Sequence, residues 1–235
     1  MPGFRLISFK RCPYVQRCVM ILVEKNVEYD IEYIDLSDRP DWFNELSPLG
    51  KVPVLEVTRD DGSKVVLFES AVINEYLDEV TPGSLLPNDP LERAHSRAWC
   101  VFATALLSDA GDITMARDED SLRRDLERLG KKLDRLEKEI DTGPFFLGAE
   151  VSLVDAAFTP ALQRLAWANE IHPAMAIFEG RPKVARWWNA LADRESVVNS
   201  AVPDLRQRYE AYVGRDRGGY RSLVGARVAA YTDGS

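Results

Sequence analysis

The first eighty residues alternate short apolar runs with amphipathic ones. Residues 3–9 predict a strand that turns Phe4 and Leu6 to one face and Arg5 and Ile7 to the other. Residues 13–26 predict a helix, because Pro13 is well tolerated in a first helical turn. The same patterns predict a strand at 29–34, a short helix at 39–46, a hairpin formed by 52–57 and 64–68, and a helix at 69–80.

The predicted order is therefore β-α-β-α-β-β-α. Strands that alternate with helices favour a parallel first pair, and the final hairpin adds an antiparallel edge to the sheet. Residues 81–90 contain three prolines and one glycine, which is typical of a linker. We therefore expect one domain over residues 1–81 and a second over residues 90–235.

Beyond the linker the apolar spacing is helical throughout. Leucines and one isoleucine recur at steps of four and three between residues 122 and 140, which favours packing within a helical bundle over a long coiled coil. Ser152 and Asp155 form a capping-box pattern at a helix start, and Pro182 opens another amphipathic helix. After Gly214 the pattern predicts no firm structure.

Composition narrows the functional classes. Of 235 residues, 46% are hydrophobic and 29% are charged, as in an ordinary globular protein, and the net charge of −8 disfavours nucleic acid as a partner. No apolar stretch approaches the roughly 20 residues of a membrane span, and the N-terminus lacks a signal-peptide pattern. Three cysteines do not make a disulfide framework, so we expect a cytoplasmic protein with no membrane partner.

Cys12 stands directly before Pro13, at the predicted start of the first helix. A disulfide to Cys18 is disfavoured, because six helical residues span roughly 9 Å and disulfides need closer Cα atoms. A metal site is also disfavoured, since His95 and His172 have no ligand spacing to the cysteines. Cys18 and Cys100 lie in apolar runs, and we expect both to be buried.

A helix start can make Cys12 nucleophilic, because the unpaired N–H groups of the first turn stabilise a thiolate. A thiol of pKa ~8.5 is only about 3% ionised at pH 7, and lowering that pKa by two units requires ~2.7 kcal/mol. An exposed helix terminus supplies only ~0.3–1 kcal/mol. Direct hydrogen bonds from N–H groups to the sulfur and the charges of Lys10 and Arg11 must supply the remaining stabilisation of the thiolate. The pattern favours a reactive thiol, although some helix-start cysteines are merely packed.

The CPYV run at residues 12–15 resembles the glutaredoxin-type CPYC site, with Val15 in place of the second cysteine. Without a second cysteine to resolve a mixed disulfide, only a catalytic cycle that uses Cys12 alone remains possible. The wider segment from residue 12 to residue 79 resembles the N-terminal domain of cysteine-type glutathione transferases, above all the omega class and the plant-type dehydroascorbate reductases. The resemblance implies a thioredoxin-like α/β N-terminal domain and an all-α C-terminal domain.

The resemblance also implies a glutathione site. Val52, before a cis Pro53, would pair its backbone with the peptide-like ligand. Glu69 and Ser70 would hold the γ-glutamyl group, with Glu69 meeting its ammonium and Ser70 its carboxylate. As alternatives, this pair could be a plain helix cap.

Two further positions match the family pattern. Arg39 stands where the family carries a lysine, and would attract the glycyl carboxylate. Tyr14 matches an aromatic residue that lines the site. Arg39 could instead be a solvated surface charge.

The resemblance implies a glutathione-dependent thiol transferase or reductase that works through a Cys12–glutathione mixed disulfide. Glutathione would be the co-substrate, no metal would take part, and a homodimer would act on a small disulfide or electrophile. Conjugation or ether cleavage are alternative reactions, and a non-enzymatic binding or regulatory protein of the same fold is a third possibility. Trp99, Phe102 or aromatic residues near Trp167 could line a second-substrate pocket, but a helical core explains them equally well.

Overall fold

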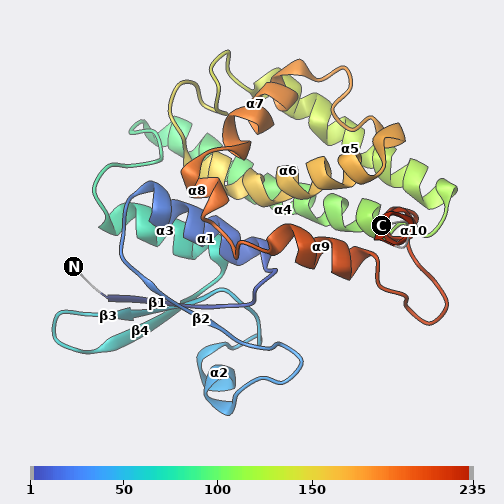
Figure 1. Cartoon of the computed structure of the whole chain (residues 1–235). Helices are drawn as coiled ribbons and strands as arrows, with labels where there is room; N and C mark the ends of the chain where they lie inside the picture. Colours follow the sequence, from blue (N-terminus) through green and yellow to red (C-terminus); the bar gives the residue numbers. More distant parts are fainter. Residues whose placement is uncertain (1–2, 233–235) are drawn as a thin grey trace. The chain divides into compact units, whose positions relative to one another are not determined.

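The computed structural model describes residues 3–232 (Figure 1). The chain divides into two compact units. The first unit comprises Met1–Ser96 together with Arg194–Pro203, and the second comprises Arg97–Asp193 together with Asp204–Ser235. Each unit has its own buried core, and the chain passes from one to the other more than once.

The first unit contains a four-stranded sheet in the order β2-β1-β3-β4. Its strands are β1 (Gly3–Ser8), β2 (Asp30–Tyr33), β3 (Val54–Thr58) and β4 (Lys64–Phe68). β1 pairs in parallel with β2 and antiparallel with β3, and β3 pairs antiparallel with β4. The parallel first pair and the antiparallel hairpin predicted from the sequence are confirmed.

Three helices complete the predicted order of the first unit: α1 (Pro13–Glu24), α2 (Asp41–Leu46) and α3 (Ser70–Val80). α1 and α3 lie side by side on one face of the sheet, whereas α2 lies beyond its opposite face (Figure 1). The buried residues of α1 are apolar apart from Gln16 and Arg17, and burial of the apolar ones stabilises the packing of the helix in the first unit. The predicted thioredoxin-like arrangement is confirmed.

The segment Arg194–Pro203 belongs to the first unit, although the residues before it, Arg97–Asp193, belong to the second. Its short helix α8 (Glu195–Val198) packs against α1. At one end, Arg194 pairs with Glu24, and at the other the Gln16 Nε2 donates to Ser200 Oγ at 3.1 Å. We call residues 194–203 the return segment.

The second unit is helical. It contains most of α4 (Pro90–Met115), and beyond that α5 (Glu119–Glu139), α6 (Leu153–Ile171), η1 (Pro173–Met175), α7 (Pro182–Ala192), α9 (Leu205–Val213) and α10 (Leu223–Thr232). The predicted all-α domain is confirmed. No helix within residues 3–232 is both long and apolar enough to cross a membrane.

Aromatic side chains form the centre of the second unit. Trp187 and Phe158 are fully buried and their ring centroids are 5.2 Å apart, and Phe146 contacts both rings. Trp99 and Phe102 extend the same cluster, with centroids 5.1 Å apart. These contacts fit the core interpretation of the two residues, whereas their possible role in a second-substrate pocket stays a prediction.

The predicted capping box at the start of α6 is present. The buried Asp155 carboxylate accepts hydrogen bonds from Ser152 N (2.8 Å), Ser152 Oγ (2.6 Å), Phe146 N (3.0 Å) and Trp187 Nε1 (2.6 Å). Burial raises the pKa of this carboxyl, against the lowering effect of the hydrogen bonds. One carboxylate thus joins the helix start, the preceding loop and α7.

The expectation of no firm structure after Gly214 is wrong. Residues beyond it form α10, and the approach to that helix is fixed by backbone contacts with the end of α4. Leu223 N donates to the Ala116 carbonyl at 3.0 Å, and Tyr220 Oη donates to the Met115 carbonyl at 3.1 Å. These contacts join residues about a hundred positions apart, so no local pattern could have predicted them.

Candidate functional site

The sheet brings the predicted site residues to one of its edges. β1 and β2 are parallel and end together, with Ser8 opposite Tyr33. β3 starts and β4 ends at this same edge, because Val54 pairs with both Ile7 and Phe68. The loops and helix starts at this edge therefore carry every predicted site residue: Cys12 and Tyr14 after β1, Arg39 after β2, Val52 before β3, and Glu69 and Ser70 after β4.

Cys12 is the N-cap residue of α1, as predicted. Its backbone is extended (φ −69°, ψ 116°), and Pro13 occupies the first helical turn. A turn closed by the hydrogen bond from Cys12 N to the Phe9 carbonyl (2.8 Å) brings the chain from β1 into the helix. The residue is partly exposed, unlike the fully buried Cys18.

The Cys12 thiol lies 3.7 Å from the Val52 carbonyl oxygen, to which it donates. Within the described chain, its side chain makes no capping hydrogen bond to the first turn of α1, which differs from the expected N–H···S contact. A neutral thiol is a donor and needs an acceptor, whereas a helix start offers only N–H donors. A thiolate has the opposite requirement, and the N–H groups of the first turn are adjacent to it.

Val52 is buried, and the peptide bond between Val52 and Pro53 is cis, as the resemblance implied. Val52 immediately precedes β3, whose first residue Val54 pairs with Phe68 at the end of β4. The Val52 carbonyl oxygen is also the acceptor for the Cys12 thiol. An extended ligand could pair with the Val52 backbone as an added strand.

Glu69 is the N-cap residue of α3 and has a positive φ of 69°, which is rare for any residue except glycine. Its side chain is exposed and makes no capping hydrogen bond within the described residues. Ser70, the first residue of α3, is buried. The simple helix-cap explanation therefore does not account for Glu69, whose strained backbone is the kind of feature found at binding sites.

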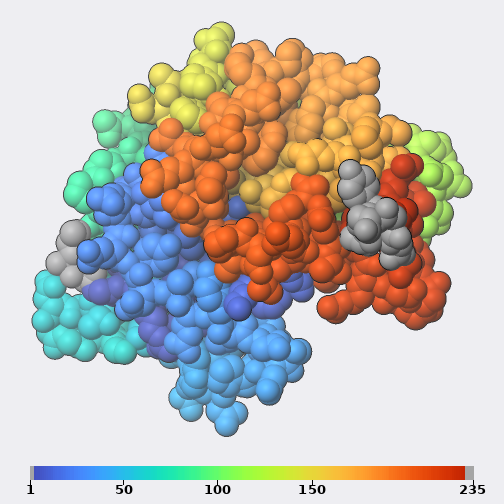
Figure 2. Space-filling model, viewed as in Figure 1, coloured from blue at the N-terminus to red at the C-terminus, as the bar shows by residue number. Residues whose placement is uncertain are grey.

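Arg39 is exposed in the loop between β2 and α2, and this region forms a bulge on the surface of the first unit (Figure 2). Its Nε donates to the Leu36 carbonyl at 3.1 Å. The guanidinium also lies against Gly50, in the turn that leads to β3. Arg39 is thus attached to two loops at the same edge of the sheet.

The other two cysteines differ from Cys12. Cys18 is fully buried, as predicted, and burial raises the pKa of its thiol, so it cannot act as a nucleophile near neutral pH. Cys100 is partly exposed, which corrects the expectation that it is buried. No disulfide joins the three cysteines of the described chain. Residues 3–232 contain no group of three His, Cys, Asp or Glu side chains that could hold a metal ion.

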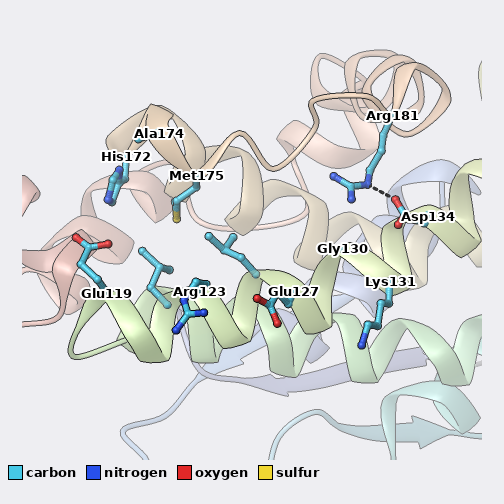
Figure 3. Close-up of a pocket in the computed structure, with 12 residues that line it drawn as sticks. Glu119, Arg123, Glu127, Gly130, Lys131, Asp134, His172, Ala174, Met175 and Arg181 are labelled. Carbon is cyan, nitrogen blue, oxygen red and sulfur yellow. Dashed lines mark hydrogen bonds and ion pairs between the residues drawn. The ribbon is translucent and has the colours of Figure 1, made fainter.

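A groove of about 650 Å³ lies in the second unit, between α5 and the segment around η1 (Figure 3). Met175 points from η1 towards α5, and the ion pair of Arg181 with Asp134 (2.8 Å) lies at one end. The buried His172 lies at the other end, near Glu119. Burial and the charge of Arg227 lower the His172 pKa, and Glu119 partly offsets them. The groove shares no residue with the predicted site.

Two residues beside the site were missed from the sequence. Gln16 lies one turn beyond Cys12, and its backbone N–H donates to the Cys12 carbonyl at 3.2 Å. Its buried side chain is held by Ser200 of the return segment. The available signal was the polar pair Gln16 and Arg17 within an otherwise apolar helix face, but no pattern pointed to Ser200 as the partner.

Known proteins resemble this chain over both of its halves. Family models of the glutathione S-transferase N-terminal and C-terminal domains match residues 11–80 and 119–190. Glutathione S-transferase omega-1 of Mus musculus is 35% identical, over 89% of this chain and 84% of its own. Glutathione S-transferase DHAR3, chloroplastic, of Arabidopsis thaliana is 31% identical, over 80% of this chain and 68% of its own. The solved structure of glutathione transferase Omega 3C from Trametes versicolor has a TM-score of 0.69 and 27% identity, and the match covers 84% of this chain and 88% of that one.

Proposed function

Because this chain belongs to the omega class of the glutathione transferase family, we propose that it is a glutathione-dependent thiol transferase or reductase with Cys12 as its nucleophile. The observation that carries the proposal is the placement of Cys12. Cys12 is partly exposed at the start of α1, and its thiol contacts the Val52 backbone, where a peptide-like ligand would pair. The buried Cys18 offers no comparable access.

The proposed reaction has two thiol–disulfide exchanges. In the first, the Cys12 thiolate attacks the glutathionyl sulfur of a mixed disulfide substrate, so that a Cys12–glutathione disulfide forms and the other thiolate leaves. In the second, the thiolate of a free glutathione attacks the glutathionyl sulfur on Cys12. Oxidised glutathione leaves and the Cys12 thiolate is regenerated. Val15 supplies no second thiol, so the cycle depends on this external glutathione.

The remaining predicted residues would bind glutathione as the co-substrate. Ser70 and the N–H groups at the start of α3 suit the γ-glutamyl carboxylate, and Glu69 suits its ammonium. The backbone of Val52 suits the central peptide unit, and Arg39 the glycyl carboxylate. Tyr14, which is exposed and lies beneath the Arg17 guanidinium (5.2 Å to the ring centroid), would line the site.

The second substrate is a small disulfide or electrophile, and the active form is a cytoplasmic homodimer. Conjugation or ether cleavage of electrophiles is the alternative chemistry for the same site. The non-enzymatic alternative predicts glutathione binding without turnover.

A substrate panel tests the proposal directly. The full chain is applied to immobilised glutathione and assayed with glutathionylated peptides, dehydroascorbate and conjugation substrates, beside Cys12→Ala. We expect retention on the resin, turnover of the disulfide substrate, and loss of that turnover in Cys12→Ala. Binding without any turnover would support the regulatory alternative, and conjugation alone would replace the thiol-transfer chemistry.

A further inference from the structure

Arg39 and Gly50 come from different loops and lie in direct contact. A methyl group added to Gly50 would overlap Nη1 of Arg39 and would lie 3.3 Å from its Cζ. Gly50 also has a positive φ of 60°. The bare Cα of Gly50 is therefore what allows the guanidinium to lie at this place.

The turn under the guanidinium is fixed by Ser47, which is buried. Gly50 N donates to the Ser47 carbonyl at 3.0 Å, closing the turn. The Ser47 hydroxyl accepts from Lys51 N (2.9 Å) and donates to the Lys51 carbonyl (2.8 Å). Three hydrogen bonds from one buried residue make this turn a stable support, so the surface presented to Arg39 is well defined.

The guanidinium is fixed from its other side by Leu36. Of the residues that the structure describes, only the Leu36 carbonyl accepts a hydrogen bond from Arg39, through Nε. Nη1 and Nη2 therefore remain available to a ligand. Two parallel N–H groups on a planar fork match a carboxylate in geometry as well as in charge.

We propose that Gly50 is a positioning residue that sets Arg39 to bind the glycyl carboxylate of glutathione, and that this contact selects a free carboxylate over an ester. The inference rests on the proposed function, because it takes Arg39 as part of the glutathione site. Gly50 itself touches no substrate group. It acts by leaving room for the guanidinium above the Ser47 turn.

The substitution Gly50→Ala should move Arg39 rather than break the fold. The overlapped atoms are the far end of a flexible side chain, which rotates away at low cost, whereas the turn is held by Ser47. Alanine at position 50 must still adopt a positive φ, which is unfavourable for a residue with a side chain. The substitution Gly62→Ala controls for this backbone effect. Gly62 has a φ of 81° in the β3–β4 turn, with nothing within 4 Å of an added methyl group.

The test is calorimetric titration of the full chain with glutathione and with glutathione glycine ethyl ester. For Gly50→Ala we expect a dissociation constant for glutathione about three- to tenfold higher, as for one partly screened charge-assisted contact. The constant for the ester should not change. Gly62→Ala should match the wild type for both ligands. Arg39→Ala should weaken glutathione binding, and Gly50→Ala added to it should have no further effect.

Several outcomes would overturn the positioning role. The first is that Gly50→Ala binds glutathione as tightly as the wild type although Arg39→Ala binds it more weakly. The second is that Gly50→Ala weakens binding of glutathione and of the ester equally. The third is that the double variant binds glutathione more weakly than Arg39→Ala alone. If the wild type bound no glutathione, the proposed function itself would fail. Urea unfolding monitors the fold of each variant. Arg39→Lys combined with Gly50→Ala is the second test, because an ammonium has no Nη1 to overlap, and it should bind glutathione more tightly than Gly50→Ala alone.

Discussion

The guanidinium of Arg194 lies against the carboxylate of Glu24, with Nε 2.9 Å from Oε2 and a second contact through Nη2. This pair attaches the return segment to the end of α1, the helix that begins at Cys12. Although burial raises the pKa of Glu24, hydrogen bonds from Arg194 and Ser196 outweigh it and lower the pKa overall. The ionised pair therefore stabilises the folded first unit.

Removing the pair should reduce stability in a pH-dependent way. We expect Glu24→Gln to lower the free energy of unfolding by about 1–2 kcal/mol at pH 7, since Arg194 is about one-third exposed and the pair is partly screened. The folded pKa of Glu24 lies below its unfolded value, so this contribution is complete above the ordinary carboxyl pKa. It is lost as the pH falls through the lowered pKa.

Urea unfolding of the wild type and Glu24→Gln at pH 7 and at successively lower pH measures the effect. The difference between them should shrink as the medium becomes acidic. Arg208→Ala is the control, because its pair with Asp204 is more exposed and only joins the N-cap residue of α9 to the next turn of that helix. An equal loss from both substitutions would show that the return segment is not anchored by Glu24.

Asp155 should be the most sensitive carboxylate in the second unit. Asp155→Ala leaves buried donors on Ser152, Phe146 and Trp187 without their acceptor, so we expect a loss of about 3–5 kcal/mol. Asp118→Ala is the matched control, because Asp118 caps α5 in a similar box that is exposed, and it should cost much less stability. Thermal unfolding compares them, and equal losses would contradict the role of burial.

Local patterns were sufficient for most of the fold. The individual strands and helices and the α6 capping box depend on residue spacing within about ten positions, which hydrophobic periodicity records. The return segment and α10 depend on contacts between distant positions, such as Gln16 with Ser200 and Leu223 with Ala116. Their own sequences carry no mark of those partners.

In the candidate site too, some features could be predicted from the sequence and others depend on contacts between distant residues. Cys12 before Pro13 is a local signal, whereas the family resemblance added the remaining residues: Tyr14, Arg39, Val52, Glu69 and Ser70. The direction of the Cys12 thiol was missed, because it depends on the loop that contains Val52. The contact of Arg39 with Gly50 was also missed, since it requires two loops to approach each other.

At position 69 we expect the glycine variant to be more stable than the alanine variant, which is the reverse of the usual order. Glycine normally destabilises a protein relative to alanine, but the φ of 69° at this position is unfavourable for any side chain. We therefore expect Glu69→Gly to be about 1 kcal/mol more stable than Glu69→Ala in urea. Alanine as the more stable variant would show that the backbone here is not strained.

Both Glu69 variants also test the glutathione site. Loss of the carboxylate should weaken glutathione binding by about 1–3 kcal/mol in each variant, if Glu69 meets the ligand ammonium. Calorimetry measures it, with Glu75→Ala as a control on a later turn of the same helix. Unchanged affinity in both folded variants would remove Glu69 from the site.

Oxidised glutathione should modify Cys12 selectively. Cys12 is partly exposed at a helix start, whereas Cys18 is fully buried with a raised pKa. Cys100 is the informative competitor, because it is also partly exposed but lies inside α4, away from any helix start. Peptide mass spectrometry after brief treatment at neutral pH should find the glutathione adduct on Cys12. Predominant labelling of Cys100 would show that exposure alone decides reactivity.

Whether the side chain at position 12 carries sulfur or oxygen should decide which reaction the protein catalyses. With Val15 in place of a second cysteine, no internal disulfide can release the product, so disulfide reduction must pass through Cys12–glutathione. A serine hydroxyl cannot form that disulfide, and Cys12→Ser should abolish thiol transfer. Conjugation needs only a bound glutathione thiolate, which a hydroxyl at the helix start can stabilise by donating a hydrogen bond. The same variant should therefore retain or increase any weak conjugating activity.

Steady-state kinetics on a disulfide and on an electrophile separates these cases. Cys18→Ser is not a suitable control because Cys18 is buried, but Cys100→Ser keeps the site intact and should behave as the wild type on both substrates. Parallel lines in double-reciprocal plots for the wild-type disulfide reaction would indicate the two-step exchange. Full disulfide reduction by Cys12→Ser would contradict the mechanism, because no other thiol of the chain stands at a helix start beside the Val52 backbone.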